Sequence, residues 1–357
     1  MNLFFELIQM AIGGRDTLTE VPKERPEWEA LLEVAGKHNL VALTFPAIDI
    51  LHDQAEVPLG IYSKWAMTAE QVKEKNARMI EACLTLSEKF PAYGFRTCIL
   101  KGQAAAAYYP FPERRQCGDI DIWLDAPQER IVAFLKEHFK VAKVVYHHAE
   151  VKMLKGIGVE VHFTPSWMNS PCANRRLQKY FRSKAEEQFG HRSEALGFCV
   201  PTRRFDAVYM LIHIYRHVLD EGIGLRQLLD YYYVLKALTP EDREAALKDI
   251  KHLKLLKFAA GVMYVLQKVF ALDSSFMLTE PDSKQGEFLL NEILVSGNFG
   301  MFDSRNKHSA DETRVMHAKR KMTRAMRYLS YYPSEVLNIP VFMVFHYFWR
   351  LSKGYLK

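Results

Sequence analysis

The stretch RRQCGDIDIW, residues 114–123, sets two carboxylates one residue apart inside an otherwise apolar run. Because residues two apart on a β-strand share a face, Asp119 and Asp121 point the same way, while Ile120 and Ile122 point to the other side. Two carboxylates held roughly 6–7 Å apart repel each other or raise each other's pKa unless a cation lies between them. The stretch therefore predicts a strand with one buried face and a divalent-cation site on the other.

A third acid on a later strand supports this site. Glu160 alternates with valines in GVEVHF, so it lies on one strand face, which His162 shares. Mg²⁺ is usually held by one or two carboxylates together with phosphate oxygens, and a third carboxylate suits a two-ion site. A lone Asp-x-Asp also fits an amphipathic strand at the surface of a sheet. The preceding Gly118, the acid at 160 and the LKGQ turn at 100–103 favour the metal site over that alternative.

The segments around the Asp-x-Asp strand predict a compact α/β unit. Short β-prone runs alternate with helical patterns, and prolines and glycines separate them. The last two strands are predicted to form a hairpin around Gly156 and Gly158. In chain order, we expect a strand in 95–102, a helix in 103–109, a strand in 118–124, a helix in 126–139 and alternating strands in 141–163.

Helical patterns dominate both flanks of this unit. Apolar residues recur at three- and four-residue spacing through residues 1–90 and again after Pro201, and residues 166–200 are predicted to be only partly helical. The fold class is therefore α+β. The predicted domains are an N-terminal helical region (1–90), an α/β core with its extension (91–200) and a C-terminal helical domain (201–357).

Composition places the chain among ordinary globular proteins. Of its 357 residues, 49% are hydrophobic and 25% charged, which suffices for a large core in two or three domains. The five cysteines form no CxxC pair, so a disulfide framework and a zinc knuckle are disfavoured and a reducing cytoplasm is expected. The longest apolar run, 339–349, is shorter than the ~20 residues that a bilayer requires. No transmembrane segment is predicted, and the N-terminus lacks the pattern of a signal peptide.

The motifs described above resemble a known superfamily. ILKGQAAAAYYPFPERRQCGDIDIWL followed by VEVHF is similar to the nucleotidyltransferases, in which Gly-Gly or Gly-Ser precedes an Asp-x-Asp/Glu strand and a lone acid follows on a later strand. LKG, YP, RxxGDIDIWL and HIYRHVLDEGIGLRQLLDYY resemble, more closely, uncharacterised bacterial nucleotidyltransferases with helical flanks. The resemblance covers about residues 85–235. It implies a polymerase-β-like core, a small mixed sheet with helices, between N-terminal and C-terminal helical regions.

This resemblance implies a reaction and a set of residues. Asp119, Asp121 and Glu160 would hold two Mg²⁺ ions, with Mn²⁺ as the alternative metal. The enzyme would transfer a nucleoside monophosphate from an NTP such as ATP to an acceptor hydroxyl and release pyrophosphate. Gln103 departs from the family pattern, because Ser or Gly is usual there. Lys101 and Arg115 either contact phosphate or lie at the surface. The predicted nucleotide-binding residues are Lys101, Gly102, Gln103, Arg115, Gly118, Arg226 and Asp230.

The helical segment after residue 201 holds three further patterns. Arg226 and Asp230, four apart, form either a helix-surface ion pair or a group that reaches the nucleotide, and the resemblance favours the second. His213 and His217 are also four apart, but the HExxH pattern of zinc enzymes is missing, so packing is favoured. The tyrosines at 231–233 are expected to pack in the core rather than to stack on a base.

The C-terminal part of the chain is basic and aromatic. Residues 305–327 hold eight Lys and Arg against two acids, an excess equal to the net charge of +6. A solvated helix face is the favoured interpretation, and binding to nucleic acid is the weaker one. The aromatic residues of 341–357 are expected to dock on the domain rather than on a membrane or a partner.

Two alternatives to the transferase follow from these patterns. One is a non-catalytic module on the same fold that binds a nucleotide or a protein partner, as in a regulatory or toxin–antitoxin pair. The other is an enzyme that acts on nucleic acid through the basic stretch. The acceptor of the favoured transferase stays open, because small molecules, sugars, proteins and RNA all fit a fold that does not fix function.

Overall fold

The computed structural model describes residues 1–54, 57–306 and 313–355. Contacts within the chain divide it into two compact units. The predicted domain boundaries at 90/91 and 200/201 stay predictions. We call Met1–Ala77, Tyr108–Gln116 and Glu221–Ser309 the helical unit, and Arg78–Ala107, Cys117–Asp220 and Ala310–Lys357 the sheet unit.

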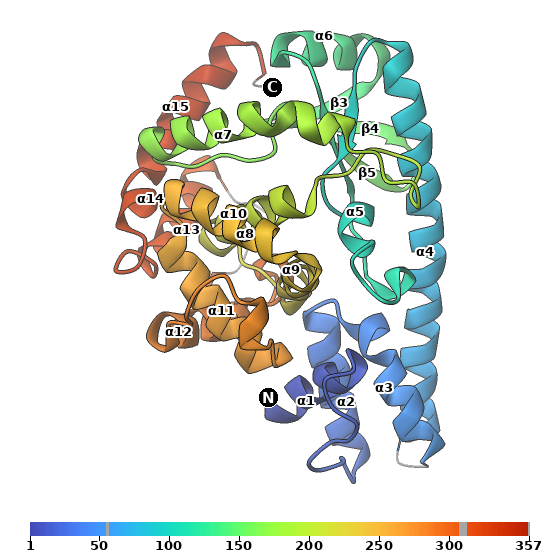
Figure 1. Ribbon diagram of the computed structural model, residues 1–357. Helices are drawn as coiled ribbons and strands as arrows, with labels where there is room; N and C mark the ends of the chain where they lie inside the picture. The colour runs from blue at the N-terminus through green and yellow to red at the C-terminus, as the bar shows by residue number, and fades with distance from the viewer. Residues whose placement is uncertain (55–56, 307–312, 356–357) are drawn as a thin grey trace. The chain divides into compact units, whose positions relative to one another are not determined.

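The sheet unit is built on a five-stranded mixed sheet with the order β1-β2-β5-β4-β3 (Figure 1). Strands β2 and β5 are parallel, and the other neighbouring pairs are antiparallel. The small mixed sheet among many helices confirms the predicted α+β class. The strands are β1 (Thr97–Ile99), β2 (Ile120–Leu124), β3 (Lys140–Val144), β4 (His148–Leu154) and β5 (Ile157–His162).

One face of the central strands forms the hydrophobic core. Ile120 and Ile122 of β2 and Val159 and Val161 of β5 are buried together with apolar residues of helices α4 and α6. A slip of one residue would turn this apolar face outward, so the burial fixes the register of β2 and β5. The same register directs the alternating acids of both strands to the opposite face.

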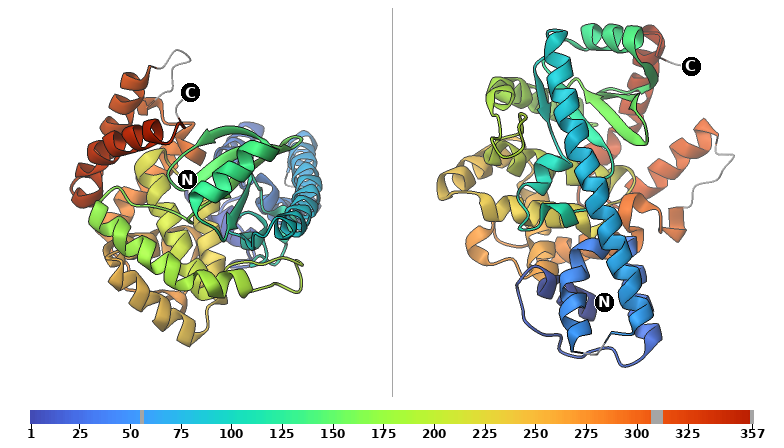
Figure 2. Two further views of the ribbon diagram at one scale, coloured as in Figure 1. Left: turned by 90° about the horizontal axis from the view of Figure 1, so that it is seen from above. Right: turned by 90° about the vertical axis from the view of Figure 1, so that its right-hand side faces the viewer.

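The helices of the sheet unit differ from prediction in two places. Helix α5 spans four residues instead of the expected seven, and the chain leaves the helix before the prolines at 110 and 112. Helix α7 spans 20 regular residues where only partial helix was expected, and it begins at Pro171, which suits a first helical turn. Helix α6 lies beside β3 (Figures 1 and 2). These helices are α5 (Gln103–Ala106), α6 (Gln128–His138), α7 (Pro171–Gly190), α8 (Arg203–Asp220), α13 (Arg314–Met326), α14 (Pro333–Leu337) and α15 (Ile339–Ser352).

The helical unit has the helices that the apolar spacing predicted. The start of α10 is typical, because Pro240 opens the helix and the Thr239 hydroxyl accepts a 3.1 Å hydrogen bond from the backbone N–H of Asp242. Helix α4 (Leu59–Ala92) begins in this unit and continues into the sheet unit. The other helices are α1 (Asn2–Ala11), α2 (Arg25–Lys37), α3 (Val41–Asp53), α9 (Leu225–Ala237), α10 (Pro240–His252), α11 (Leu256–Phe270) and α12 (Ser283–Ser296), with short 3₁₀ turns η1 (Pro112–Arg114), η2 (Ser274–Phe276), η3 (Asn298–Gly300) and η4 (Ser304–Asn306).

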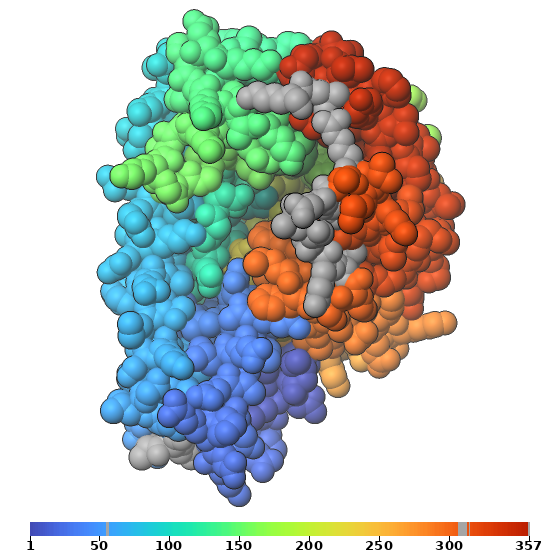
Figure 3. All heavy atoms as spheres, turned by 180° about the vertical axis from the view of Figure 1, so that it is seen from behind, coloured from blue at the N-terminus to red at the C-terminus, as the bar shows by residue number. Residues whose placement is uncertain are grey.

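The terminal helix α15 docks by one side only. Tyr146 contacts Phe342 and Trp349 with ring centroids 5.8 and 6.0 Å apart, in line with the expected docking. The opposite side is apolar and exposed, since Phe348 and Leu351 each keep more than half of their surface. The C-terminal segment accordingly forms part of the molecular surface in Figure 3. In the described part of the chain, no helix is long and apolar enough to span a membrane.

Candidate active site

The acids of β2 and β5 lie next to each other on one face of the sheet. In this parallel pair, Asp121 is directly opposite Glu160, and Trp123 is opposite His162. Residues paired in this way on adjacent strands project together from the same face. Ligand atoms of Asp121, Glu160 and His162 all lie within 4.8 Å of one another. The register thus brings together two acids that are 39 residues apart in the sequence.

Asp119 lies on the same face, directly before β2. A Cβ atom on Gly158 of β5 would be 3.5 Å from the Cβ of Asp119, which places this aspartate beside the residue two positions before Glu160. In the described residues, Asp119 is not a member of the close group formed by Asp121, Glu160 and His162. Its pKa nevertheless responds to the charges of both neighbouring acids. The three predicted acids therefore share one electrostatic site.

Lys101 approaches the acids from the end of β1. Its Nζ lies 2.7 Å from Oδ1 of Asp121. The following Gly102 has φ +59°, and a Cβ atom there would meet the carbonyl oxygen of Asp119 at 3.3 Å. Glycine adopts this conformation at low cost, whereas other residues are strained. The turn at Gly102 therefore packs closely against the backbone of Asp119, and Lys101, whose ammonium pairs with Asp121, directly precedes it.

Two histidines of this site were not singled out from the sequence. His148 of β4 lies directly opposite His162 of β5, and its Nδ1 is 3.4 Å from Oε2 of Glu160. The Nε2 of His147 is 2.8 Å from the Nδ1 of His148. His162 in turn places its Nε2 2.9 Å from Oδ1 of Asp121. A His-His doublet in the strand next to GVEVHF is the signal that could have found them.

Burial and the neighbouring charged groups shift the pKa values of these side chains, in opposite directions for Asp121 and His162. Burial raises the pKa of Asp121, but Lys101 and His162 outweigh it and hold that pKa well below its usual range. Burial lowers the pKa of His162, but its bonds to Asp121 and Glu160 raise the pKa above its ordinary value. Burial together with the charge of Asp121 raises the pKa of Asp119 to about 6.

The donor set suits a hard divalent cation. Carboxylate oxygens are the protein ligands that Mg²⁺ and Mn²⁺ prefer, and this face presents three carboxylates. Burial is the largest cause of the raised pKa of Asp119, and the charges of Asp121 and Glu160 add to it, whereas Lys101 opposes it. The three acids therefore keep their place as the predicted metal ligands.

The family comparison is consistent with this geometry. The model of a family described as uncharacterised nucleotidyltransferase matches residues 24–271, which include all five strands and the three acids. The chain belongs to this nucleotidyltransferase family. Membership confirms the predicted superfamily and supports nucleotidyl transfer as the general activity. No curated protein matches the chain.

Gln103 and Gly118, two of the predicted nucleotide-binding residues, have distinct environments. Gln103 is buried, and its Nε2 donates a 3.3 Å hydrogen bond to the Sγ of Cys117. The amide therefore links the loop after β1 to the segment before β2. Gly118 is exposed and stands directly before Asp119. Contacts from Gln103 and Gly118 to phosphate stay predictions.

A second ionic cluster brings Arg115, Arg226 and Asp230 together within the helical unit. Arg115 forms a bidentate pair with Asp230, with distances of 2.7 and 2.8 Å. The Tyr109 hydroxyl donates to Oδ1 of Asp230 at 2.6 Å, and Arg226 lies 3.5 Å from Oδ2. Burial raises the pKa of Asp230, but Arg115 outweighs it and lowers the pKa below its usual value. The observed contacts of this cluster are internal, and its contact with a nucleotide stays a prediction.

The remaining helical patterns serve packing. The rings of His213 and His217 meet edge to face with centroids 4.3 Å apart, and no third ligand of metal-binding type joins them in the described residues. The tyrosines at 231–233 are all buried, and Tyr233 packs against Tyr109 at 4.3 Å. All five cysteines are free thiols.

The basic stretch 305–327 lies only partly within the described residues. Lys307, Asp311 and Glu312 are outside them. Three of the described cations bind inside their own unit: Arg305 pairs with Glu292 and Asp303, Lys321 with Asp220, and Arg324 donates to the carbonyl of Val218. These cations are therefore engaged within the protein, and the nucleic-acid interpretation loses part of its basis.

Proposed function

We propose that this protein is a Mg²⁺-dependent enzyme that transfers a nucleoside monophosphate from an NTP to a hydroxyl group of an acceptor. Asp119, Asp121 and Glu160 hold the metal in this proposal, with room in the donor set for two ions. The observation that carries it is the parallel register, which sets Asp121 opposite Glu160 on the sheet face away from the core.

The reaction follows from the groups on this face. The acceptor oxygen attacks the α-phosphorus, the new phosphorus–oxygen bond forms, and the bond to pyrophosphate breaks with its electron pair on the leaving oxygen. Bound divalent ions would neutralise the triphosphate and acidify the acceptor hydroxyl. The acids position the ions, and the hydroxyl proton passes to a nearby base or to water.

Lys101 is proposed to contact the phosphates. Its ammonium already faces Asp121, and 18% of its side chain remains exposed. The triphosphate and the three carboxylates together carry more negative charge than two divalent ions offset, so a fixed cation at this position stabilises both the bound donor and the leaving pyrophosphate. Gly102 maintains the turn that aims this side chain.

The test is transfer of label from each α-³²P-labelled NTP to an acceptor in cell extract, with Mg²⁺ or Mn²⁺ present. We expect label on an acceptor with the wild type and none with Asp121→Asn or Glu160→Gln. Asp125→Asn is the matched control, because it makes the same change in an aspartate outside the acidic cluster. Asp125 directly follows β2, about 13 Å along the strand from Asp121, and accepts a 2.8 Å hydrogen bond from Arg96.

Two results would contradict the proposal. Equal labelling by the wild type and both acid variants would exclude the metal site. Saturable NTP binding without transfer to any extract component would favour the non-catalytic module on the same fold.

A further inference from the structure

The sheet unit contains a pocket of about 310 Å³ that has no part in the proposed chemistry. It lies between helices α7 and α15, and Tyr146 contributes from the loop after β3. The α15 residues that line it lie outside the segment matched by the family model. Its lining includes Tyr146, Asn174, Arg175, Gln178, Arg182, Val341, Phe342 and Phe345.

One wall of the pocket is cationic. Arg175 and Arg182 are seven residues apart on α7, so they project from nearly the same side of the helix. Both are exposed, and neither forms an ion pair with any residue of the described ranges. Guanidinium groups without acidic neighbours in a concave site are the usual partners of phosphate and carboxylate groups.

The opposite wall is aromatic and apolar. The ring of Tyr146 contacts those of Phe342 and Phe345, with centroids 5.8 and 6.3 Å apart. Val341 and Phe345 each keep about half of their surface exposed, although both are large apolar side chains. A ligand with an apolar body would remove this surface from water, at about 25 cal/mol per Å².

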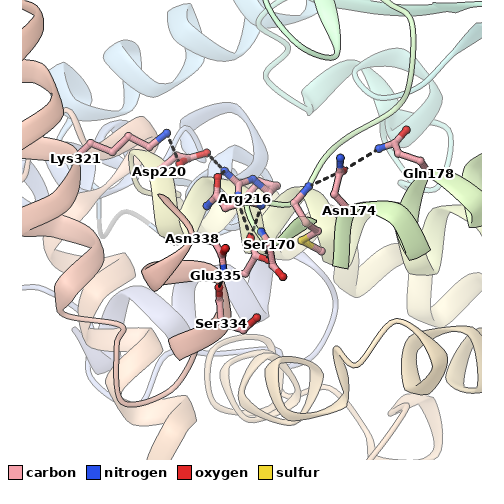
Figure 4. Close-up of polar contacts among 11 residues, drawn as sticks. Ser170, Asn174, Gln178, Arg216, Asp220, Lys321, Ser334, Glu335 and Asn338 are labelled. Atoms are coloured by element: carbon pink, nitrogen blue, oxygen red, sulfur yellow. Dashed lines mark hydrogen bonds and ion pairs between the residues drawn. The ribbon is translucent and has the colours of Figure 1, made fainter. Parts of the chain in front are cut away.

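Two amides that line the pocket, Asn174 and Gln178 (Figure 4), are already fixed by hydrogen bonds within the protein. Asn174 donates to the Tyr146 hydroxyl at 2.9 Å, and its Oδ1 accepts from the backbone N–H of Met168 at 3.1 Å. Gln178 donates to the carbonyl of Ser166 at 2.8 Å and accepts from the hydroxyl of Thr164 at 2.7 Å. The amides are thus engaged, which leaves the two arginines to contact a ligand.

A buried carboxylate joins α14 to the start of α7. Glu335 accepts from the backbone N–H groups of Asn169 and Ser170 at 2.6 and 3.1 Å, and Arg216 lies 3.4 Å from the same side chain (Figure 4). These bonds connect the C-terminal helices to α7. The pocket is therefore largely preformed, which lowers the ordering cost of binding.

We infer that this pocket binds a small organic anion, with its apolar body against Tyr146, Phe342 and Phe345 and its anionic group held by Arg175 and Arg182. This inference does not rest on the proposed function, because none of these residues belongs to the acidic site. Its volume lies at the lower end of the range for ligand pockets, which suits a ligand of one or two rings.

The test is calorimetric titration of the full chain with 1-naphthyl phosphate. We expect saturable binding, at least tenfold weaker binding of both 1-naphthol and inorganic phosphate, and at least a tenfold loss in the double variant Arg175→Gln/Arg182→Gln. Lys179→Gln is the matched charge control, because Lys179 is exposed on α7 but does not line the pocket. Phe345→Ala should weaken binding, whereas Phe348→Ala, on the exposed side of α15, should not.

The overturning results are equally specific. Absence of saturable binding, or equal losses in Lys179→Gln and in the arginine double variant when both have wild-type circular dichroism, would contradict the inference. If the protein bound anionic phospholipid vesicles but not 1-naphthyl phosphate, the arginines would form a membrane-binding surface, and the inference of a ligand pocket would be wrong. Asp121→Asn should bind 1-naphthyl phosphate normally, so this result separates the pocket from the proposed function.

Discussion

Two of the buried ionic clusters in the described residues, the acidic cluster of the sheet unit and the Asp230 cluster of the helical unit, have their charges organised in opposite ways. In the sheet unit, three carboxylates gather around Lys101 and His162, and the pKa of Asp119 rises to about 6. In the helical unit, Asp230 faces Arg115 and Arg226, and its pKa falls below the usual range. The first cluster is short of positive charge, and the second is not.

This difference in charge distinguishes a cluster suited to binding a cation from a cluster that stabilises the fold. Both oxygens of Asp230 already accept bonds from Arg115, and Tyr109 adds another, so the observed contacts of this carboxylate account for a structural role. The acids of the sheet unit retain an unbalanced charge that a divalent cation would neutralise. Sequence spacing alone does not distinguish these two situations.

The largest expected effect is on catalysis. Asp121→Asn keeps the size of the side chain but removes a charge at the centre of the acidic cluster. We expect nucleotidyl transfer to fall by roughly 10²–10³-fold or more, the range seen when a key electrostatic group is removed from an active site. Measured rates of pyrophosphate release by this variant and by Asp125→Asn check the prediction. Equal rates in Asp121→Asn and Asp125→Asn would show that the acidic cluster of the sheet unit has no catalytic role.

The second effect is on folding. Asp230→Asn leaves Arg115 and Arg226 in a buried site without their carboxylate. Breaking a buried pair in this way costs about 3–5 kcal/mol of the free energy of unfolding. Urea denaturation of this variant measures the loss, and Glu244→Gln, at an exposed position of α10, gives the scale of a surface change. A loss below ~1 kcal/mol would show that the cluster is not structural.

A change of opposite sign is expected at Asp119. Its folded-state pKa of about 6 lies above the ordinary carboxylate value, so its ionisation destabilises the fold as pH rises from about 4 to 6. In EDTA at pH 7.5, Asp119→Asn should therefore stabilise the protein by up to about 3 kcal/mol, and at pH 4 it should change little. Thermal unfolding with and without Mg²⁺ checks this. Destabilisation at pH 7.5 in EDTA would contradict the charge imbalance.

The last effect is a pH dependence set by a buried histidine of the helical unit. Burial holds the pKa of His38 at about 3, and the backbone N–H of Leu225 donates to its Nδ1. Its neutral form therefore adds stability above pH 6.5, and this stability is lost as pH falls toward 3. His38→Gln should flatten the pH dependence of unfolding between pH 6.5 and 4 by up to ~1.4 kcal/mol per pH unit. If His38→Gln left the pH dependence of the free energy of unfolding unchanged, the low pKa of His38 would be contradicted.

The sequence predicted the strands well because their signals are local. Alternation around Asp121 and Glu160 indicated which face is buried, and Gly156, with φ +76°, makes the predicted hairpin turn. The length of α5 was missed because the capping and packing of a four-residue helix leave little trace in periodicity. The prolines at 110 and 112 correctly predicted that the helix ends before them, but they did not predict that it ends as early as Ala106.

The site itself could be predicted only in part. Alternation placed Asp121 and Glu160 on strand faces, but their register depends on long-range pairing. The roles of His147 and His148 follow from the β4–β5 pairing, which no local pattern specifies. The same limit applies to Arg115, whose partner Asp230 lies 115 residues away.

The proposed function requires that the acids of β2 and β5 bind a divalent ion and, through it, an NTP. Electron paramagnetic resonance of Mn²⁺, titrated with the protein and each of the four NTPs, measures this without requiring an acceptor. We predict stoichiometric Mn²⁺ binding that an NTP strengthens in the wild type and in Asp125→Asn, and at least tenfold weaker binding in folded Asp121→Asn and Glu160→Gln. Mn²⁺ affinity that is unchanged in both acid variants would contradict the account.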